Sequence, residues 1–253
     1  MVAARKYCFV DFTQEGGRPL HALTTNAVAT AADNQVDYQY INNQRFEHIQ
    51  TGQNDALQYI TAATGWTIPV DGTDGDGVEI TNGILAGRDL SFTVGTDPAF
   101  FVAFGYYVGT IAAQDVYGGG FRKQGAYVDI TTPSLMNTVY DDKAALYVMD
   151  AAGDWRTTTS IGGSDTQTDI TTTACANATW VYQKVLISAA GAVTYLIGQS
   201  TVSFAAAKAA AAAPAGAVAA TMTAAIIMTP YFVTVSTGTL GDVKLLEWEA
   251  GHQ

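Results

Sequence analysis

The sequence predicts an all-β fold, a jelly roll or related β-sandwich that follows an extended N-terminal arm and carries one short alanine-rich helix. Three observations support this prediction. Short segments of alternating apolar and polar residues recur from residue 65 onward, turn residues separate them, and no amphipathic helical pattern lies between them. Because β-sandwiches of about 250 residues often form one domain, the 253 residues fit an arm (1–62) and a single sandwich (63–253).

The predicted arm is rich in Asn and Gln and has few aliphatic residues in a regular period. Such a segment needs another surface to offset the entropy lost when it becomes ordered. Aromatic anchors suit this purpose because they bury much area with few rotatable bonds. The predicted subunit or lattice contacts are Val10, Phe12, Tyr38, Tyr40, Phe46 and Tyr59. Two alternatives remain: the anchors dock on the chain's own sandwich, or the segment forms ordinary surface loops and strands.

The sandwich begins with clear alternation, since Val78 and Ile80 flank the polar Glu79. Residues 100–111 form a nearly continuous apolar and aromatic run, which is typical of a buried strand. The clearest unit is a hairpin whose apolar strands flank a turn at Gly191, a residue that readily adopts positive φ. The residues expected near the core are Trp180, Leu186, Tyr195 and Trp248.

One segment interrupts the strands. Residues 204–213 are nearly all alanine, which has the highest helix propensity, and Pro214 ends a helix. A helix of this length, about 15 Å, buries little area. We therefore expect a connection across the edge of the sandwich, with a helix that contacts another subunit as the alternative.

The charge of the chain limits its partners. With a formal net charge of −11 and 12 Lys and Arg residues, it has too few clustered cations to favour nucleic acid or an anionic membrane surface. The uncharged segment 209–228 is mostly Ala, Gly and Thr, so we expect no membrane span there, and we expect no signal peptide. Cys8 and Cys175 are expected to be buried free thiols, with a disulfide as the alternative.

An acidic stretch, VDGTDGDGVEIT at residues 70–81, could suggest a calcium loop. An EF-hand loop requires acidic residues at positions 1, 3 and 5 and Glu at position 12, and starting at Asp71 or at Asp74 does not meet this pattern. Asp-Gly pairs form tight turns, so we predict a turn followed by a strand from Val78. A looser calcium site built from loop carboxylates is the alternative.

No catalytic, cofactor or metal site is predicted. His21, His48 and His252 lie in polar stretches without partners at metal or triad spacing, and the glycines at 118–120 predict a flexible loop. Glu247 and Glu249 occupy alternate positions of one strand, which places both outside when Trp248 is inside. That pattern is typical of a half-buried strand rather than of the facing carboxylates of a glycosidase.

The C-terminal half resembles a known class of fold. The segments ATWVYQKVLISAAGAVTYLIGQSTV and IIMTPYFVTVSTGTLGDVKLLEWEAG resemble the closing strands of concanavalin-like, laminin-G-like jelly rolls. The ending PYFVTVSTGTLGDVKLLEWEAGHQ also resembles virion structural proteins of tailed bacteriophages that carry this fold, and the likeness covers about residues 66–253.

The resemblance implies a non-enzymatic virion structural protein, most simply a capsid decoration or cement protein that packs on the capsid lattice and stabilises it. Its partners would be the major capsid protein or other virion subunits and further copies of itself, for which a trimer is one arrangement. It would be made in the host cytoplasm and would reside on the capsid surface. The low content of charged residues, 14%, agrees with this role because large surfaces can be buried without desolvating many ions.

Two other functions are weighed against this one. The first is a glycan-binding, lectin-like module of a phage fibre or receptor-binding protein, which requires exposed aromatic platforms. The candidates for such platforms are Tyr106, Tyr107, Tyr117, Tyr140 and Trp155. The second is a polysaccharide hydrolase, which requires two acidic residues at catalytic separation inside a cleft.

Overall fold

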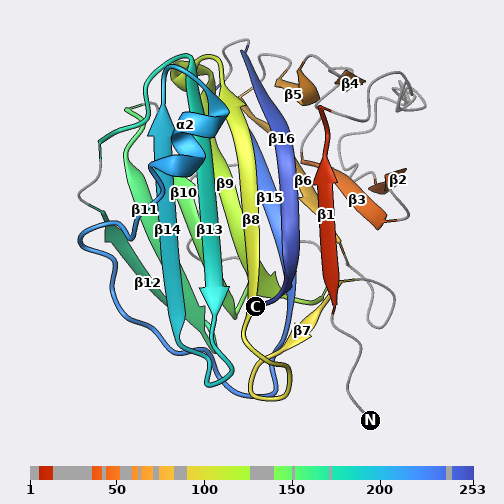
Figure 1. Ribbon diagram of the computed structural model, residues 1–253, viewed down its shortest axis with the longest axis vertical. Helices are drawn as coiled ribbons and strands as arrows, with labels where there is room; N and C mark the ends of the chain where they lie inside the picture. The colour runs from red at the N-terminus through yellow and green to blue at the C-terminus, as the bar shows by residue number, and fades with distance from the viewer. Residues whose placement is uncertain are drawn as a thin grey trace.

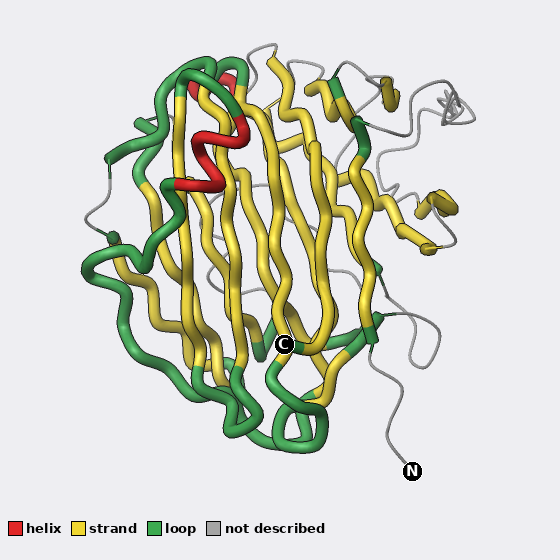
Figure 2. The backbone as a smooth tube through the Cα atoms, in the orientation of Figure 1, coloured by secondary structure: helices red, strands yellow, loops and turns green. Residues whose placement is uncertain are grey.

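The computed structural model describes residues 6–13, 36–41, 44–51, 59–61, 64–70, 74–82, 90–125, 140–149, 152–170, 173–237 and 241–253. Within these residues, two antiparallel sheets lie face to face (Figures 1 and 2). The predicted all-β jelly-roll class is therefore confirmed. No helix among the described residues is long and apolar enough to cross a membrane.

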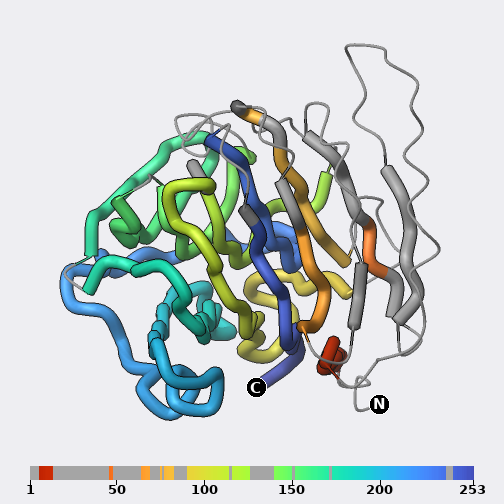
Figure 3. The backbone as a smooth tube through the Cα atoms, turned by 90° about the horizontal axis from the view of Figure 1, so that it is seen from above, coloured from red at the N-terminus to blue at the C-terminus, as the bar shows by residue number. Residues whose placement is uncertain are grey.

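The sheet nearer the viewer in Figure 1 has seven strands in the part of the chain that is described. Its order is β14 (Val193–Ser200), β13 (Thr179–Ile187), β8 (Phe100–Val108), β16 (Gly241–His252), β5 (Gly65–Val70) and β4 (Tyr59–Thr61). Strand β1 (Tyr7–Asp11) also pairs with β16, alongside its C-terminal half (Figures 1 and 3). The two ends of the described chain are thus hydrogen-bonded to each other.

The second sheet has nine strands in the described residues. Its order is β12 (Ser164–Asp169), β11 (Trp155–Ile161), β10 (Lys143–Val148), β9 (Gln114–Lys123), β15 (Ile227–Thr237), β6 (Asp74–Thr81), β3 (Gln44–Thr51) and β2 (Val36–Ile41). The short strand β7 (Phe92–Thr93) pairs with β15, and a 3-10 turn, η1 (Ile111–Ala113), precedes β9.

Aromatic rings fill the space between the sheets. Phe104 of β8 packs edge-on against Trp248 of β16 at 4.7 Å between ring centroids and against Phe232 of β15 at 5.4 Å. Tyr195 and Trp248 are buried as predicted. Trp180 and Leu186 are not in this core, because β13 turns Val181, Gln183, Val185 and Ile187 inward and leaves the alternate residues on its outer face.

A buried polar side chain connects the two sheets. Gln183 accepts a hydrogen bond from the Tyr106 hydroxyl (2.7 Å) within its own sheet and donates to the backbone oxygen of Gly119 (2.9 Å) in the other. The predicted flexible loop at 118–120 is therefore wrong, since these glycines belong to β9. Any side chain at Gly119 would collide with the backbone of β15, where a Cβ would lie 2.1 Å from the oxygen of Tyr231.

The predicted N-terminal arm is part of the sandwich. Val10, Phe12 and Phe46 are fully buried in the main core, where Phe12 packs on Trp66 at 5.5 Å between ring centroids. Of the alternatives considered, these three side chains therefore dock on the chain's own sandwich and are not exposed for contacts with another subunit. The division at residue 62 separates no independent unit, because β1 to β4 pair within both sheets. Tyr38, Tyr40 and Tyr59 lie in β2 and β4, but their side chains are outside the described residues.

The alanine-rich helix α2 (Phe204–Ala209) is shorter than the predicted helix of residues 204–213. Ser203 caps it by accepting a hydrogen bond from the Ala206 N–H. The helix ends early because Ala212 forms two backbone hydrogen bonds with Ile197 of β14, which requires extended chain. In Figure 1, α2 lies across β13 and β14 on the outer face of the seven-stranded sheet. Gly105 makes room for it, since a Cβ there would lie 2.2 Å from the Phe204 ring.

Part of the outer face of the nine-stranded sheet, over β9, β10 and β15, is also buried. Tyr231, Val233 and Val235 of β15 form an apolar cluster there with residues of β9 and β10. This explains why β15 is buried on both faces, whereas simple alternation would leave one face exposed. Cys8 and Cys175 are buried free thiols, as expected.

We expect Gln183→Met to destabilise the protein by about 1–3 kcal/mol, because the Gly119 carbonyl and the Tyr106 hydroxyl would lose their partner inside the core. Urea unfolding measures this change. The control is Thr194→Val on the exposed face of β14, which should change stability by less than about 0.5 kcal/mol. Equal stability of Gln183→Met and the wild type would show that the bridge between the sheets contributes nothing.

Candidate functional site

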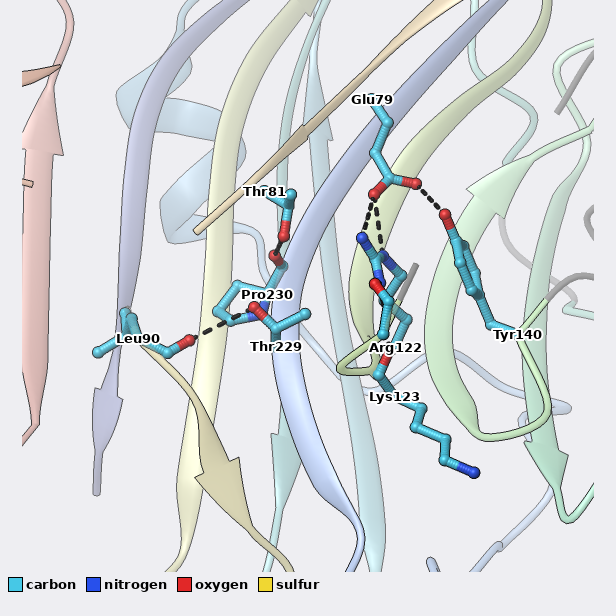
Figure 4. Close-up of polar contacts among 9 residues, drawn as sticks. Glu79, Thr81, Leu90, Arg122, Lys123, Tyr140, Thr229 and Pro230 are labelled. Atoms are coloured by element: carbon cyan, nitrogen blue, oxygen red, sulfur yellow. Dashed lines mark hydrogen bonds and ion pairs between the residues drawn. The ribbon is translucent and has the colours of Figure 1, made fainter. Parts of the chain in front are cut away.

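An ion cluster lies buried on the outer face of the nine-stranded sheet (Figure 4). Arg122 donates from Nε to Glu79 Oε1 (2.9 Å), and its Nη2 lies 2.8 Å from the same oxygen. Tyr140 donates from its hydroxyl to Glu79 Oε2 (2.6 Å), and the guanidinium carbon lies 4.4 Å from the centre of the Tyr140 ring. Burial by itself lowers the pKa of Arg122, but the Glu79 carboxylate more than offsets this, so the pKa is raised.

The polar groups of this cluster already bond to one another and to the nearby backbone. Arg122 also donates from Nη1 to the backbone oxygens of Lys123 and Gly125, which fixes the end of β9. Both carboxylate oxygens of Glu79 are engaged, and neither charged side chain is exposed to solvent. Breaking such a pair leaves an uncompensated buried charge, so we assign these residues to stability rather than to ligand binding.

The same cluster changes the interpretation of the acidic stretch. Asp71 lies outside the described residues, and Asp74 and Asp76 lie in β6 without described side chains. Glu79, expected on the polar face of a strand, points into the buried cluster. Strand β6 starts at Asp74, which is earlier than the predicted start at Val78. The early start is possible because Gly75 adopts a φ of +84° at a bulge, where the pairing of β6 with β15 shifts register between Val235 and Thr237. Within the described ranges, no group of three or more His, Cys, Asp or Glu side chains could hold a metal.

A second polar cluster joins the chain ends to a turn. Asp97 pairs with Lys6 at 3.0 Å and accepts a hydrogen bond from the Thr93 N–H at 2.7 Å. His252 Nε2 lies 3.4 Å from the other Asp97 oxygen. Burial alone would raise the pKa of Asp97, but the Thr93 hydrogen bond and Lys6 lower it below its usual value. His252 comes from a polar stretch of the sequence, yet its side chain is nearly buried, while His21 lies outside the described residues and the His48 side chain is not described.

The outer face of the seven-stranded sheet carries an exposed aromatic surface. On β1, Cys8 and Val10 face the core, so Tyr7 and Phe9 face outward, with 55% and 42% of their surface exposed. They are the exposed aromatic side chains in the part of the chain that is described. The Tyr7 ring lies across Gly251 of β16, where a Cβ would come within 2.7 Å of its Cδ2. The absence of a side chain at Gly251 therefore lets this ring cover the sheet.

Two charged side chains lie on the same face of the sheet as these rings. Tyr7 donates from its hydroxyl to Glu249 Oε1 (2.9 Å), and Phe9 is directly opposite Glu249 across the strand pair. Burial, and then this hydrogen bond, raise the pKa of Tyr7 to about 12. Lys184 of β13 lies 3.7 Å from the centre of the Phe101 ring, and its burial lowers its pKa. We call the group formed by Tyr7, Phe9, Glu249 and Lys184 the β1 platform.

A second glutamate of β16 on this face is engaged elsewhere. Glu247 pairs with Lys208 of α2 at 2.7 Å, and Lys208 lies 5.4 Å from the centre of the Tyr182 ring. As predicted, Glu247 and Glu249 share the outer face while Trp248 is buried. The carboxylates thus hold a lysine and a tyrosine in place.

The predicted aromatic platforms are mostly wrong. Tyr106, Tyr117 and Trp155 belong to the main core, and Tyr140 is buried beside Arg122. Tyr107 is half-buried against Trp180, at 4.7 Å between ring centroids. The sequence predicted subunit contacts at Val10 and Phe12 rather than at Tyr7 and Phe9, but Val10 and Phe12 point to the opposite side of the chain, into the core. The signal was the alternation in KYCFVDF, where Cys8, Val10 and Phe12 form one set.

Comparison with known proteins supports the class of fold. No protein-family model matches the chain, and no curated protein matches it by sequence. The carbohydrate recognition domain of Emp47p has a TM-score of 0.51 at 6% identity, covering 88% of this chain and 96% of that one. The exoplasmic/lumenal domain of VIP36, in a form bound to Ca²⁺ and Man3GlcNAc, has a TM-score of 0.50 at 9% identity, covering 82% and 83%.

A protein of unknown function from Shewanella oneidensis MR-1 covers 100% of this chain and 89% of its own, at 12% identity and a TM-score of 0.43. At the identities of the Emp47p and VIP36 domains, structural likeness establishes the fold and not the site. The protein therefore has the jelly-roll fold of lectin-type domains.

The Asp97 cluster should make part of the stability pH-dependent. A carboxylate whose folded pKa is depressed contributes stability above its unfolded pKa, near 4, and that contribution is lost as the pH falls through the folded pKa. We expect Asp97→Asn to lower stability at neutral pH by about 0.5–1.5 kcal/mol, with a smaller difference from the wild type below pH 4. Thermal melts across this range measure it, and the exposed Asp141→Asn is the control; a constant difference at every pH would contradict the assignment.

Proposed function

We propose that this protein is a non-enzymatic, lectin-like carbohydrate-binding module and that the β1 platform is its glycan-binding surface. The observation that carries the proposal is the pair of exposed rings, Tyr7 and Phe9, on one face of β1 beside the Glu249 carboxylate. The fold supports it, because structures with similar folds include domains named for carbohydrate recognition.

The spacing of the rings suits an extended ligand. Residues two apart in a strand point to the same side about 7 Å from each other, so Tyr7 and Phe9 present two successive apolar faces. Sugar rings have apolar C–H faces, and aromatic side chains cover such faces at little cost in rotamer entropy. Sugar hydroxyls could donate to Glu249, which borders the rings, and accept from Lys184, which lies two strands beyond Glu249 in the same row of the sheet.

The same contacts favour binding over catalysis. A glycosidase needs one carboxyl group with a raised pKa and a second one free to act as base or nucleophile. On this face Glu249 accepts from Tyr7 and Glu247 pairs with Lys208. Both carboxylates are thus engaged by neighbouring side chains, which they orient.

A glycan array with the purified full-length chain, followed by calorimetry on the best ligand, tests this function. We expect Tyr7→Ala and Phe9→Ala each to weaken binding about tenfold or more, which is at least 1.4 kcal/mol. Both rings are exposed, so folding should be preserved. Ile227→Ala on β15 is a matched control, because Ile227 has the same exposed fraction as Phe9, 42%, but lies in the other sheet. Failure of every glycan to bind, or an equal loss with the control, would refute the proposal.

A virion structural role is the second candidate, as a capsid decoration or cement protein that contacts the major capsid protein. It rests on the resemblance of the C-terminal segment, and the edge of the seven-stranded sheet favours it. Among the described strands β1 pairs with β16 alone, and it carries two exposed aromatic residues. A strand edge of this kind is a common place for another chain to dock.

Co-sedimentation with assembled phage capsids would test this role, and we expect Tyr7→Ala with Phe9→Ala to reduce occupancy while Ile227→Ala does not. Deletion of residues 1–60 is unsuitable for this purpose, because Val10, Phe12 and Phe46 belong to the core and their loss would unfold the sandwich. If the double variant bound capsids at wild-type occupancy, the lattice contact would not involve β1.

A further inference from the structure

A second concave site lies at the opposite edge of the seven-stranded sheet. A cleft of about 610 Å³ opens between β14, the segment 173–176 and the chain that follows α2. This volume is within the range of small-molecule sites in proteins. We call it the β14 cleft, and it shares no residue with the β1 platform.

The cleft forms because two segments part after one point of contact. The backbone N–H and C=O of Ile197 pair with Ala212 at 2.9 and 3.0 Å. The backbone groups of Gln199, two residues further along β14, point to the same side of the strand. Because this pairing is antiparallel, Gln199 lies opposite Ala210, which caps the C-terminus of α2, so no strand of the described chain pairs with Gln199 on this side. The cleft therefore presents one backbone donor and one backbone acceptor.

Side chains add further hydrogen-bonding groups. Ser200 accepts from the Val202 N–H at 3.0 Å, which leaves its own hydroxyl proton free to be donated. The Gln199 amide nitrogen donates to the Thr173 oxygen at 2.7 Å, which holds this side chain in place with its amide oxygen available.

The opposite wall, formed by the chain after α2, is apolar and uncharged. Ala212, Ala213 and Pro214 line it, and no Asp, Glu, Lys, Arg or His is among the residues that form the cleft. A charged ligand would lose its hydration without gaining a counter-charge, and the net charge of −11 further disfavours an anion. The fitting ligand is neutral, with several hydroxyls and one apolar face.

We infer that the β14 cleft binds a neutral sugar residue, whose hydroxyls pair with Gln199 and Ser200 while its C–H face covers the alanine and proline wall. This inference does not depend on the β1 platform, which lies at the other edge of the sheet. A chain with both sites would bind either one glycan at two points or two separate glycans.

Backbone amide NMR with the full-length protein tests the inference. The probes are glucose, galactose, mannose and N-acetylglucosamine at millimolar concentration, with glucuronate as the charged counterpart. We expect at least one neutral sugar to shift the amide signals of Gln199, Ser200 and Ala213, and glucuronate to leave them unchanged. Shifts confined to β1 and β16 would support the platform and overturn the cleft, and no shift with any neutral sugar would also overturn it.

Two variants separate ligand binding from folding. Ala213→Leu fills the cleft from an exposed position, and we expect it to weaken sugar binding about tenfold or more. Ala205→Leu places the same side chain at an exposed position of α2 outside the cleft and should bind as the wild type does. Equal affinity in Ala213→Leu and Ala205→Leu would refute the site, whatever the behaviour of Tyr7→Ala.

Discussion

The alternation of residues along β16 is the constraint on which the rest of the structure depends. This strand pairs with β8 on one side and with β5 and β1 on the other, so it fixes the register of three neighbours. Trp248 points into the core, where it contacts Phe104 and Phe46. A shift by one residue would bury Glu247 and Glu249 and expose Trp248, so the register is strongly specified.

The outer face of β16 links the fold to the proposed function. Glu249 orients Tyr7, Glu247 anchors the lysine of α2, and Gly251 leaves room for the Tyr7 ring. The β1 platform therefore combines residues from the two ends of the chain with Lys184 from the middle. A rigid sheet suits a binding surface of this kind, because its rings are held in place before a ligand arrives and less entropy is lost on binding.

The nine-stranded sheet shows a different use of polar residues. Glu79 and Arg122 are fully buried, yet they satisfy each other and the surrounding backbone. Their net contribution to stability is modest once desolvation is included, but removal of either one would leave a buried charge without a partner. The bridge from Gln183 to Gly119 applies the same principle between the sheets, in a core that is otherwise aromatic and aliphatic.

The sequence by itself determined the class of fold, the hairpin at Gly191, the two buried thiols and the outward position of Glu247 and Glu249. These depend on local patterns, namely turn chemistry and alternation within one strand, which one segment records completely. The tertiary structure alone decided which face of each strand is covered. Trp180 is outside and Gln183 inside because of what packs against β13, and Glu79 is buried because Arg122, forty-three positions away, meets it. The same holds for the candidate site: alternation separates Tyr7 and Phe9 from Val10 and Phe12, but only the pairing of β1 with β16 shows which set faces solvent.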